Sequence, residues 1–213
     1  MNSMRPIRDA APARQFDVYY DYLCPFVYRT SVLLQNVLDS GERSIDVRWR
    51  YFSLTQVNSK DEGWTIWDAP ESERPRGLLA FKAAEAARRQ EAFDRFHMPL
   101  LRARHVGRAD LDDVAVLERV AEDSGLDLDL FRRDFADRTI LTALERDHRE
   151  AVANHGVFGT PTFVFAGGPA AYVRLSEAPE QVDSIEIFDR LVTVAAAEPR
   201  IIEIKRPVKP SPD

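Results

Sequence analysis

Cys24 is the only cysteine of the 213-residue sequence, and it stands immediately before Pro25. Proline favours the first position of a helix, because its fixed φ fits there and its missing N–H leaves no hydrogen bond unmade. A thiol just before it therefore lies at a helix N-terminus, where unpaired N–H groups and the helix dipole stabilise a thiolate. The thiolate is the nucleophilic form of cysteine. The position predicts a reactive Cys24, although a lone cysteine can also be a small buried apolar residue.

A second short segment places a proline where the backbone must be unusual. The sequence GVFGTPTFVF at 156–165 sets Pro161 directly before an apolar stretch with strand composition. Proline cannot donate a hydrogen bond to a β-ladder. A cis Thr160–Pro161 bond in a tight turn fits this position, and a trans proline at a strand end is the alternative.

Several other site chemistries are excluded by residue counts and spacing. One cysteine allows neither an intramolecular disulfide, nor a cysteine-rich zinc site, nor a Cys-x-x-Cys dithiol. The four histidines, His97, His105, His148 and His155, lack the i,i+4 pairing of helical metal ligands. We therefore predict no metal site, and expect these histidines to face solvent or to cap helix ends.

Composition limits the kinds of partner. The chain has 29 Lys+Arg against 35 Asp+Glu, a net charge of −6, which argues against general binding to nucleic acid or to an anionic membrane. The N-terminal stretch contains no apolar signal-like region, and no apolar run is long enough to span a bilayer. With its single thiol, the sequence favours a cytoplasmic location.

From the N-terminus to the C-terminus, the spacing of apolar residues predicts the element order β-α-β, then a block of helices, then β-β-α. Residues 55–75, with Trp64 and Trp67, are expected to form a long loop that is a candidate lid over the site. The predicted elements are a strand at 16–20, a helix from Pro25 stopped by Gly41, a strand at 45–54, helices at 78–96, 114–122, 131–135 and 141–154, strands at 162–165 and 171–175 joined by a hairpin at 166–169, and a helix at 181–197.

These motifs and this order of elements resemble the DsbA-like branch of the thioredoxin superfamily, over about residues 16–206. Within it, the sequence looks most like the FrnE-type proteins and the related mycothiol-dependent reductases. The resemblance implies an α/β fold with a thioredoxin-like β-α-β…β-β-α core and a large helical insertion between the second and third core strands. The implied divisions are a discontinuous thioredoxin-like domain at 15–57 and 157–200, an insertion domain at 76–156, and flexible tails at 1–14 and 206–213.

The resemblance also implies roles for individual residues. Cys24 matches the family's nucleophile and Pro161 its facing cis-proline, while the backbone of Thr160 would pair with an extended thiol or peptide substrate. Pro25 and Phe26 would complete the substrate-binding surface. One position departs from the pattern, because Val27 stands where the family carries its second cysteine. Dithiol exchange needs a resolving thiol in the same site, so Val27 predicts that resolution comes from outside the chain.

The function implied is a thiol-disulfide oxidoreductase that works with one cysteine. Its co-substrate would be a small thiol of the glutathione or mycothiol type, its partner a disulfide or another electrophile, and it would hold no tightly bound cofactor. Relatives of this fold imply that subunits can pair as a homodimer. Two alternatives stay open: a transferase or isomerase like the kappa-class glutathione transferases, which use a serine where Cys24 stands, and a non-catalytic binding protein.

Overall fold

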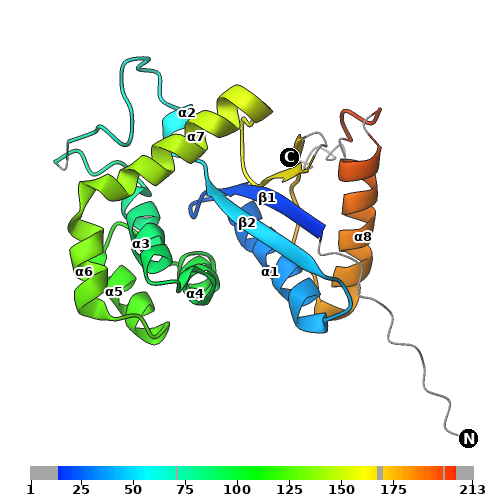
Figure 1. Cartoon of the computed structure of the whole chain (residues 1–213), viewed down its shortest axis with the longest axis horizontal. Helices are drawn as coiled ribbons and strands as arrows, with labels where there is room; N and C mark the ends of the chain where they lie inside the picture. The colour runs from blue at the N-terminus through cyan, green and yellow to red at the C-terminus, as the bar shows by residue number, and fades with distance from the viewer. Residues whose placement is uncertain (1–13, 71, 167–169, 199, 205–213) are drawn as a thin grey trace, which may run out of the picture.

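A computed structural model describes residues 14–70, 72–166, 170–198 and 200–204 of the chain (Figure 1). In chain order the elements are β1 (Arg14–Tyr20), α1 (Pro25–Ser40), β2 (Ile45–Tyr51), α2 (Leu54–Val57), α3 (Leu78–Arg89), α4 (Phe93–His105), α5 (Val114–Asp123), α6 (Leu128–Ala136), a 3-10 turn η1 (Arg138–Ile140), α7 (Leu141–His155), β3 (Thr162–Phe165), β4 (Ala170–Tyr172) and α8 (Gln181–Ala197).

The described strands form one four-stranded sheet in the order β2-β1-β3-β4. β1 runs parallel to β2 and antiparallel to β3, and β3 is antiparallel to β4. The parallel pair requires a crossover, which α1 supplies. The antiparallel pairing brings residues 145 positions apart into register, since Val18 lies opposite Phe163. The fold class predicted from the sequence, α/β with a large helical segment between the second and third core strands, is confirmed.

One face of the sheet is covered by α1 and α8, which lie side by side in Figure 1. Alternate residues of β1 point to this face, as the two-residue period of a strand requires, so Phe16 and Val18 are fully buried there. They pack with Leu33 and Leu34 of α1 and with Phe188 of α8. Burial of about 1.5–3 kcal/mol per large apolar side chain makes this cluster the main force holding α1 to the sheet.

The helices between β2 and β3 form a group beside the sheet, and α7 leads from that group back to β3 (Figure 1). Tyr19, on the opposite side of β1 from Val18, packs with Phe52, Ala151 and Val157. α7 therefore covers part of the second face. A larger buried cluster extends from Tyr20, the last residue of β1, and Tyr22 into the helical group. The sheet and the helical group are therefore joined by one continuous set of buried side chains.

Several predicted boundaries were wrong. The helix expected at 78–96 is two helices, because the chain breaks at 90–92 and Glu91 takes a positive φ of 55°. The strand expected to reach Leu54 ends at Tyr51, and Leu54 begins α2, whose first turn is capped by the Ser53 hydroxyl. β4 ends at Tyr172 rather than at residue 175.

Other local predictions hold. Gly41 and Gly156 end α1 and α7 in the left-handed conformation that glycine adopts without strain.

The tail expected at 1–14 is wrong at its last residue, since Arg14 opens β1 and pairs with Ile45. The rest of that segment, the tail at 206–213 and most of the hairpin connection at 166–169 lie outside the described residues.

No helix in the described ranges is long and apolar enough to cross a membrane.

Candidate functional site

Cys24 is the residue from which α1 begins. It has extended backbone angles, φ −84° and ψ 117°, and Pro25 is the first helical residue. Its N–H donates to the Asp21 carbonyl at 3.0 Å, and its own carbonyl accepts from the Val27 N–H at 3.1 Å. The thiol therefore stands at the end of α1 where the helix dipole is positive, as the sequence predicts.

The segment containing Pro161 lies directly opposite this thiol. The Thr160–Pro161 peptide bond is cis. Cys24 Sγ donates to the Thr160 carbonyl at 3.2 Å, across 136 positions of the sequence. Only 4% of Cys24 is exposed, and Thr160 is buried with it. The Thr160 hydroxyl has no hydrogen-bond partner in the described part of the chain.

Position 27 lies in the same buried cluster as the thiol. Val27 is 0% exposed and shares its apolar surroundings with Cys24, Tyr20 and Tyr22. A side chain there is shielded from solvent, and Cys24 is the only cysteine of the sequence. Position 27 therefore contributes apolar packing to the surroundings of Cys24.

Asp21 orders the turn that leads into the site, a role that the sequence reading missed. Its carboxylate is buried and accepts from the backbone N–H of Leu23 at 2.8 Å and of Leu54 at 2.7 Å. Burial raises the pKa of Asp21 to about 6, against the lowering effect of these two hydrogen bonds. The signal available in the sequence was an acidic residue directly after an apolar strand and three positions before the cysteine.

We expect Asp21→Ala to lower the free energy of unfolding by about 2 kcal/mol at pH 5, below the folded-state pKa of Asp21, because two N–H groups lose their acceptor. Urea unfolding measures the change. Asp39→Ala is the matched control, since Asp39 is exposed at the far end of α1 and, within the described ranges, accepts a hydrogen bond from Gln35 alone. A loss no larger than that of Asp39→Ala would show that Asp21 does not hold the turn.

A surface of aromatic and cationic side chains borders Cys24. The guanidinium carbon of Arg29 lies 5.2 Å from the Phe26 ring centre, and that of Arg174 lies 4.9 Å from it. Arg174 also lies 5.8 Å from the Tyr172 ring centre, and Tyr172 packs edge-on against Phe158 at 5.0 Å. Phe158 is 67% exposed. We call Phe26, Arg29, Tyr172 and Arg174 the arginine rim.

The predicted site residues come from two segments that the fold brings together. Cys24, Pro25 and Phe26 supply the first turn of α1, and Thr160 and Pro161 supply the facing turn. The backbone beyond β4 joins them, because the Val173 N–H donates to the Pro161 carbonyl at 3.1 Å. The rim arginines were not singled out from the sequence, since Arg174 reaches Phe26 only through this long-range pairing.

The expectation that the histidines face solvent or cap helix ends was wrong for two of them. His97 is 3% exposed and lies 3.1 Å from the Tyr22 hydroxyl through Nδ1. His148 is 5% exposed and accepts the Ser53 N–H through Nδ1 at 3.1 Å. Both sit among aromatic rings, so their burial is part of the core that joins the helical group to the sheet.

The tryptophans of the predicted lid differ from one another. Trp67 is buried and packs against the His148 ring, while Trp64 is partly exposed and donates through its indole nitrogen to Glu73. Among the described residues, no hydrogen bond or ring contact joins either tryptophan to Cys24 or Pro161. Trp67 anchors the 55–75 segment to α7, and the structure gives no support for a lid over the site.

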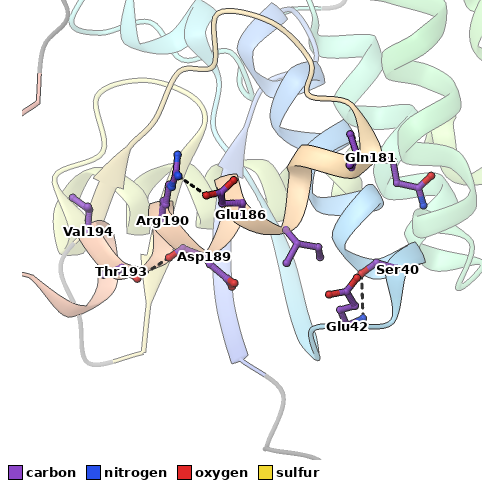
Figure 2. A pocket seen from close by; sticks show the side chains of 10 residues that line it. Ser40, Glu42, Gln181, Glu186, Asp189, Arg190, Thr193 and Val194 are labelled. Carbon is purple, nitrogen blue, oxygen red and sulfur yellow. Dashed lines mark hydrogen bonds and ion pairs between the residues drawn. The ribbon is translucent and has the colours of Figure 1, made fainter.

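Two further features lie away from this site. Among the described residues no group of three or more histidine, cysteine, aspartate or glutamate side chains could hold a metal ion. A hollow runs along α8 and the C-terminal end of α1, where Ser40 and Glu42 lie near Gln181 and Arg190 pairs with Glu186 (Figure 2). α1 rises about 1.5 Å per residue, which separates this hollow from Cys24 by roughly the length of the helix.

Comparison with known proteins agrees with this geometry. The chain is 27% identical over 200 residues to an uncharacterized protein of Mycobacterium tuberculosis, covering 92% of this chain and 83% of the relative. It is 32% identical over 166 residues to a Na⁺/H⁺ antiporter of Salinispora tropica, covering 75% of this chain but 22% of the antiporter.

Among solved structures, a probable DsbA oxidoreductase from Streptomyces coelicolor superposes with a TM-score of 0.62 at 18% identity, covering 93% of this chain and 94% of the other. That likeness concerns the fold. The family model described as a DSBA-like thioredoxin domain matches residues 15–184, which include the whole site around Cys24 and Pro161. This chain is therefore a member of the DSBA-like thioredoxin domain family.

Proposed function

We propose that the protein is a thiol-disulfide oxidoreductase that works with the single nucleophile Cys24 and is resolved by an external small thiol. The observation that carries the proposal is the placement of Cys24 Sγ at the start of α1, 3.2 Å from the Thr160 carbonyl, with Val27 buried where a second thiol would stand. The family supplies the reaction type, and position 27 supplies the restriction to one thiol.

The proposed cycle is a pair of thiol-disulfide exchanges. The Cys24 thiolate attacks one sulfur of a disulfide; the Cys24–sulfur bond forms, the substrate disulfide breaks, and the leaving thiolate takes a proton from water. A small thiolate then attacks the adduct sulfur that came from the substrate, which releases a new disulfide and restores the Cys24 thiolate. No electrons are gained or lost across the two steps, and no metal or bound cofactor takes part.

The surroundings of Cys24 support a cycle that uses one thiol of the protein and one external small thiol. Its low exposure restricts attack to slender disulfides or to an extended segment that can enter beside the Thr160 backbone. The cycle draws on a pool of reduced small thiol, which the proposal places in the cytoplasm; glutathione and mycothiol both satisfy this chemistry.

Intact-mass measurement after incubation with glutathione disulfide tests the proposal. We expect the native protein to gain one glutathionyl group and to lose it again in excess reduced glutathione, whereas Cys24→Ala gains none at all. A Cys24→Ser variant separates the transferase alternative, because a transferase of this fold would keep small-thiol binding without forming an adduct. Absence of an adduct on the native protein, with glutathione binding retained in Cys24→Ser, would contradict the proposed cycle.

A further inference from the structure

The arginine rim places positive charge around Phe26, two residues after Cys24. Arg29 follows Phe26 by one helical turn on α1. The other side of the rim comes from the end of β4 and the residues after it. Tyr172 is the last residue of β4, Arg174 follows two positions later, and the Val173 N–H between them donates to the Pro161 carbonyl. The Arg29 guanidinium ties the two sides together by donating to the Leu175 carbonyl at 2.9 Å.

The rim arginines differ in their contacts from those described arginines that pair with a carboxylate. Arg43, Arg50, Arg89 and Arg132, for example, each pair with a carboxylate. Within the described ranges, neither Arg29 nor Arg174 has a carboxylate at ion-pairing distance; aromatic rings and one backbone carbonyl are their partners. Arg174 is exposed, so its N–H groups face solvent around the Phe26 ring.

This arrangement suits a ligand that carries carboxylates. A guanidinium held over an aromatic ring is oriented in advance, and its planar fork matches a carboxylate with two parallel hydrogen bonds. An uncharged ligand would gain only apolar contact with Phe26 and Tyr172. Burying the rim under a neutral molecule would also remove water from Arg174 without giving it a charged partner.

We propose that the arginine rim selects an anionic, carboxylate-bearing small thiol and its disulfide as the partner of Cys24, with Arg174 as the main charge contact. The inference rests on the proposed function and narrows it, because glutathione carries two carboxylates whereas the sugar-based mycothiol carries none. The step itself is the exchange described above: the glutathione disulfide bond breaks, the Cys24–sulfur bond forms, and one glutathione thiolate leaves and is protonated by water.

The test compares two disulfides that differ in charge. Rates of adduct formation on Cys24 are measured by intact mass with glutathione disulfide and with uncharged bis(2-hydroxyethyl) disulfide, and the ratio of the two rates is the readout. We expect Arg174→Glu to lower that ratio about tenfold, since it replaces an attraction by a repulsion at the site, and we expect added salt to lower the ratio of the native protein as well.

The matched control is Arg119→Glu. Arg119 is an exposed arginine of α5 that has no ion pair among the described residues, so it makes the same change in net charge far from the rim. We expect the native ratio in this variant. If both disulfides form adducts and Arg174→Glu has the same ratio of adduct-formation rates as the native protein, the inference is overturned. The proposed function stands in that case. Absence of adducts from both disulfides on the native protein overturns both.

Discussion

Substituting Val27 by cysteine is expected to turn the glutathione adduct of this protein from a stable product into a short-lived intermediate. After incubation with glutathione disulfide, the native chain should carry one glutathionyl group. The Val27→Cys variant should instead lose two hydrogens and release two molecules of reduced glutathione per chain. We expect the lifetime of the adduct to fall at least about a hundredfold, because the second exchange becomes intramolecular.

The geometry favours this result. Val27 lies in the first turn of α1, and its N–H donates to the Cys24 carbonyl at 3.1 Å. Both side chains belong to one buried cluster, so an introduced thiol stands beside Cys24 rather than in solvent. Replacing the two methyl groups of Val27 by one sulfur leaves a small void, which we expect to cost about 1 kcal/mol of stability.

Two variants isolate the effect. Val32→Cys adds a thiol to the same helix, two turns from the site, and should keep the glutathione adduct of the native chain. Val27→Ala should also keep it, which separates the thiol from the loss of volume. If Val27→Cys accumulates the same adduct as Val32→Cys, position 27 is not where an internal resolving thiol acts.

The second large expected effect is a loss of stability in mild acid. Burial lowers the pKa of His97 to about 3, helped by Arg88, and lowers that of His148 to about 4, helped by Arg149. Both values lie below the ordinary 6.5, so the unfolded chain binds more protons than the folded one between these limits. The stabilising contribution of each neutral histidine is present above pH 6.5 and is lost as the pH falls toward its folded value.

Asp21 acts in the opposite direction. Its pKa is raised to about 6, so its contribution to stability is full below its ordinary value near 3.8 and is lost as the pH rises through 6. One pKa unit corresponds to about 1.36 kcal/mol, and two histidines outweigh one carboxyl. We expect the free energy of unfolding to fall by about 3 kcal/mol between pH 6.5 and about pH 4.

Urea unfolding at a series of pH values measures this slope, and His97→Gln tests its origin. Glutamine can still bond to the Tyr22 hydroxyl but does not titrate, so the variant should lose little stability over the same range, because the loss from His148 is then nearly balanced by the gain from Asp21. The shape of the curve is the readout, since the variant is also expected to be less stable at every pH. Parallel curves for the two proteins would exclude His97 as the source.

Local signals explain how much could be predicted. Pro25 and Gly41 mark the ends of α1 through their own backbone preferences, so the helix and the placement of Cys24 at its start follow from the sequence. The position of Pro161 before an apolar strand already suggested a cis bond, and the resemblance then placed Thr160 and Pro161 opposite Cys24; the Thr160 carbonyl lies 3.2 Å from the thiol. What the sequence predicted well therefore depends on neighbours within a few residues or on a known family pattern.

The features that were missed depend on contacts between distant segments. Glu91 takes a positive φ that few non-glycine residues adopt, and nothing in its neighbours indicates the break between α3 and α4. His97 is buried because Ser31 and Tyr22 meet it from 66 and 75 positions away. Arg174 likewise reaches Phe26 only because the neighbouring Val173 bonds to the Pro161 carbonyl and so holds this segment beside the site.

The helix that carries the thiol is shared by both parts of the molecule. Leu33 and Val37 hold α1 against the sheet, while Ser31 bonds to His97 of α4 at 3.4 Å and Tyr28 stacks on His105. His105 also donates to the Tyr22 carbonyl at 2.9 Å, two residues before Cys24. If the helical group moves away from the sheet, the turn that positions Cys24 must change as well. The packing of these two parts and the position of the sulfur are therefore cooperative, and the chemical accessibility of Cys24 reports whether the helical group is packed against the sheet.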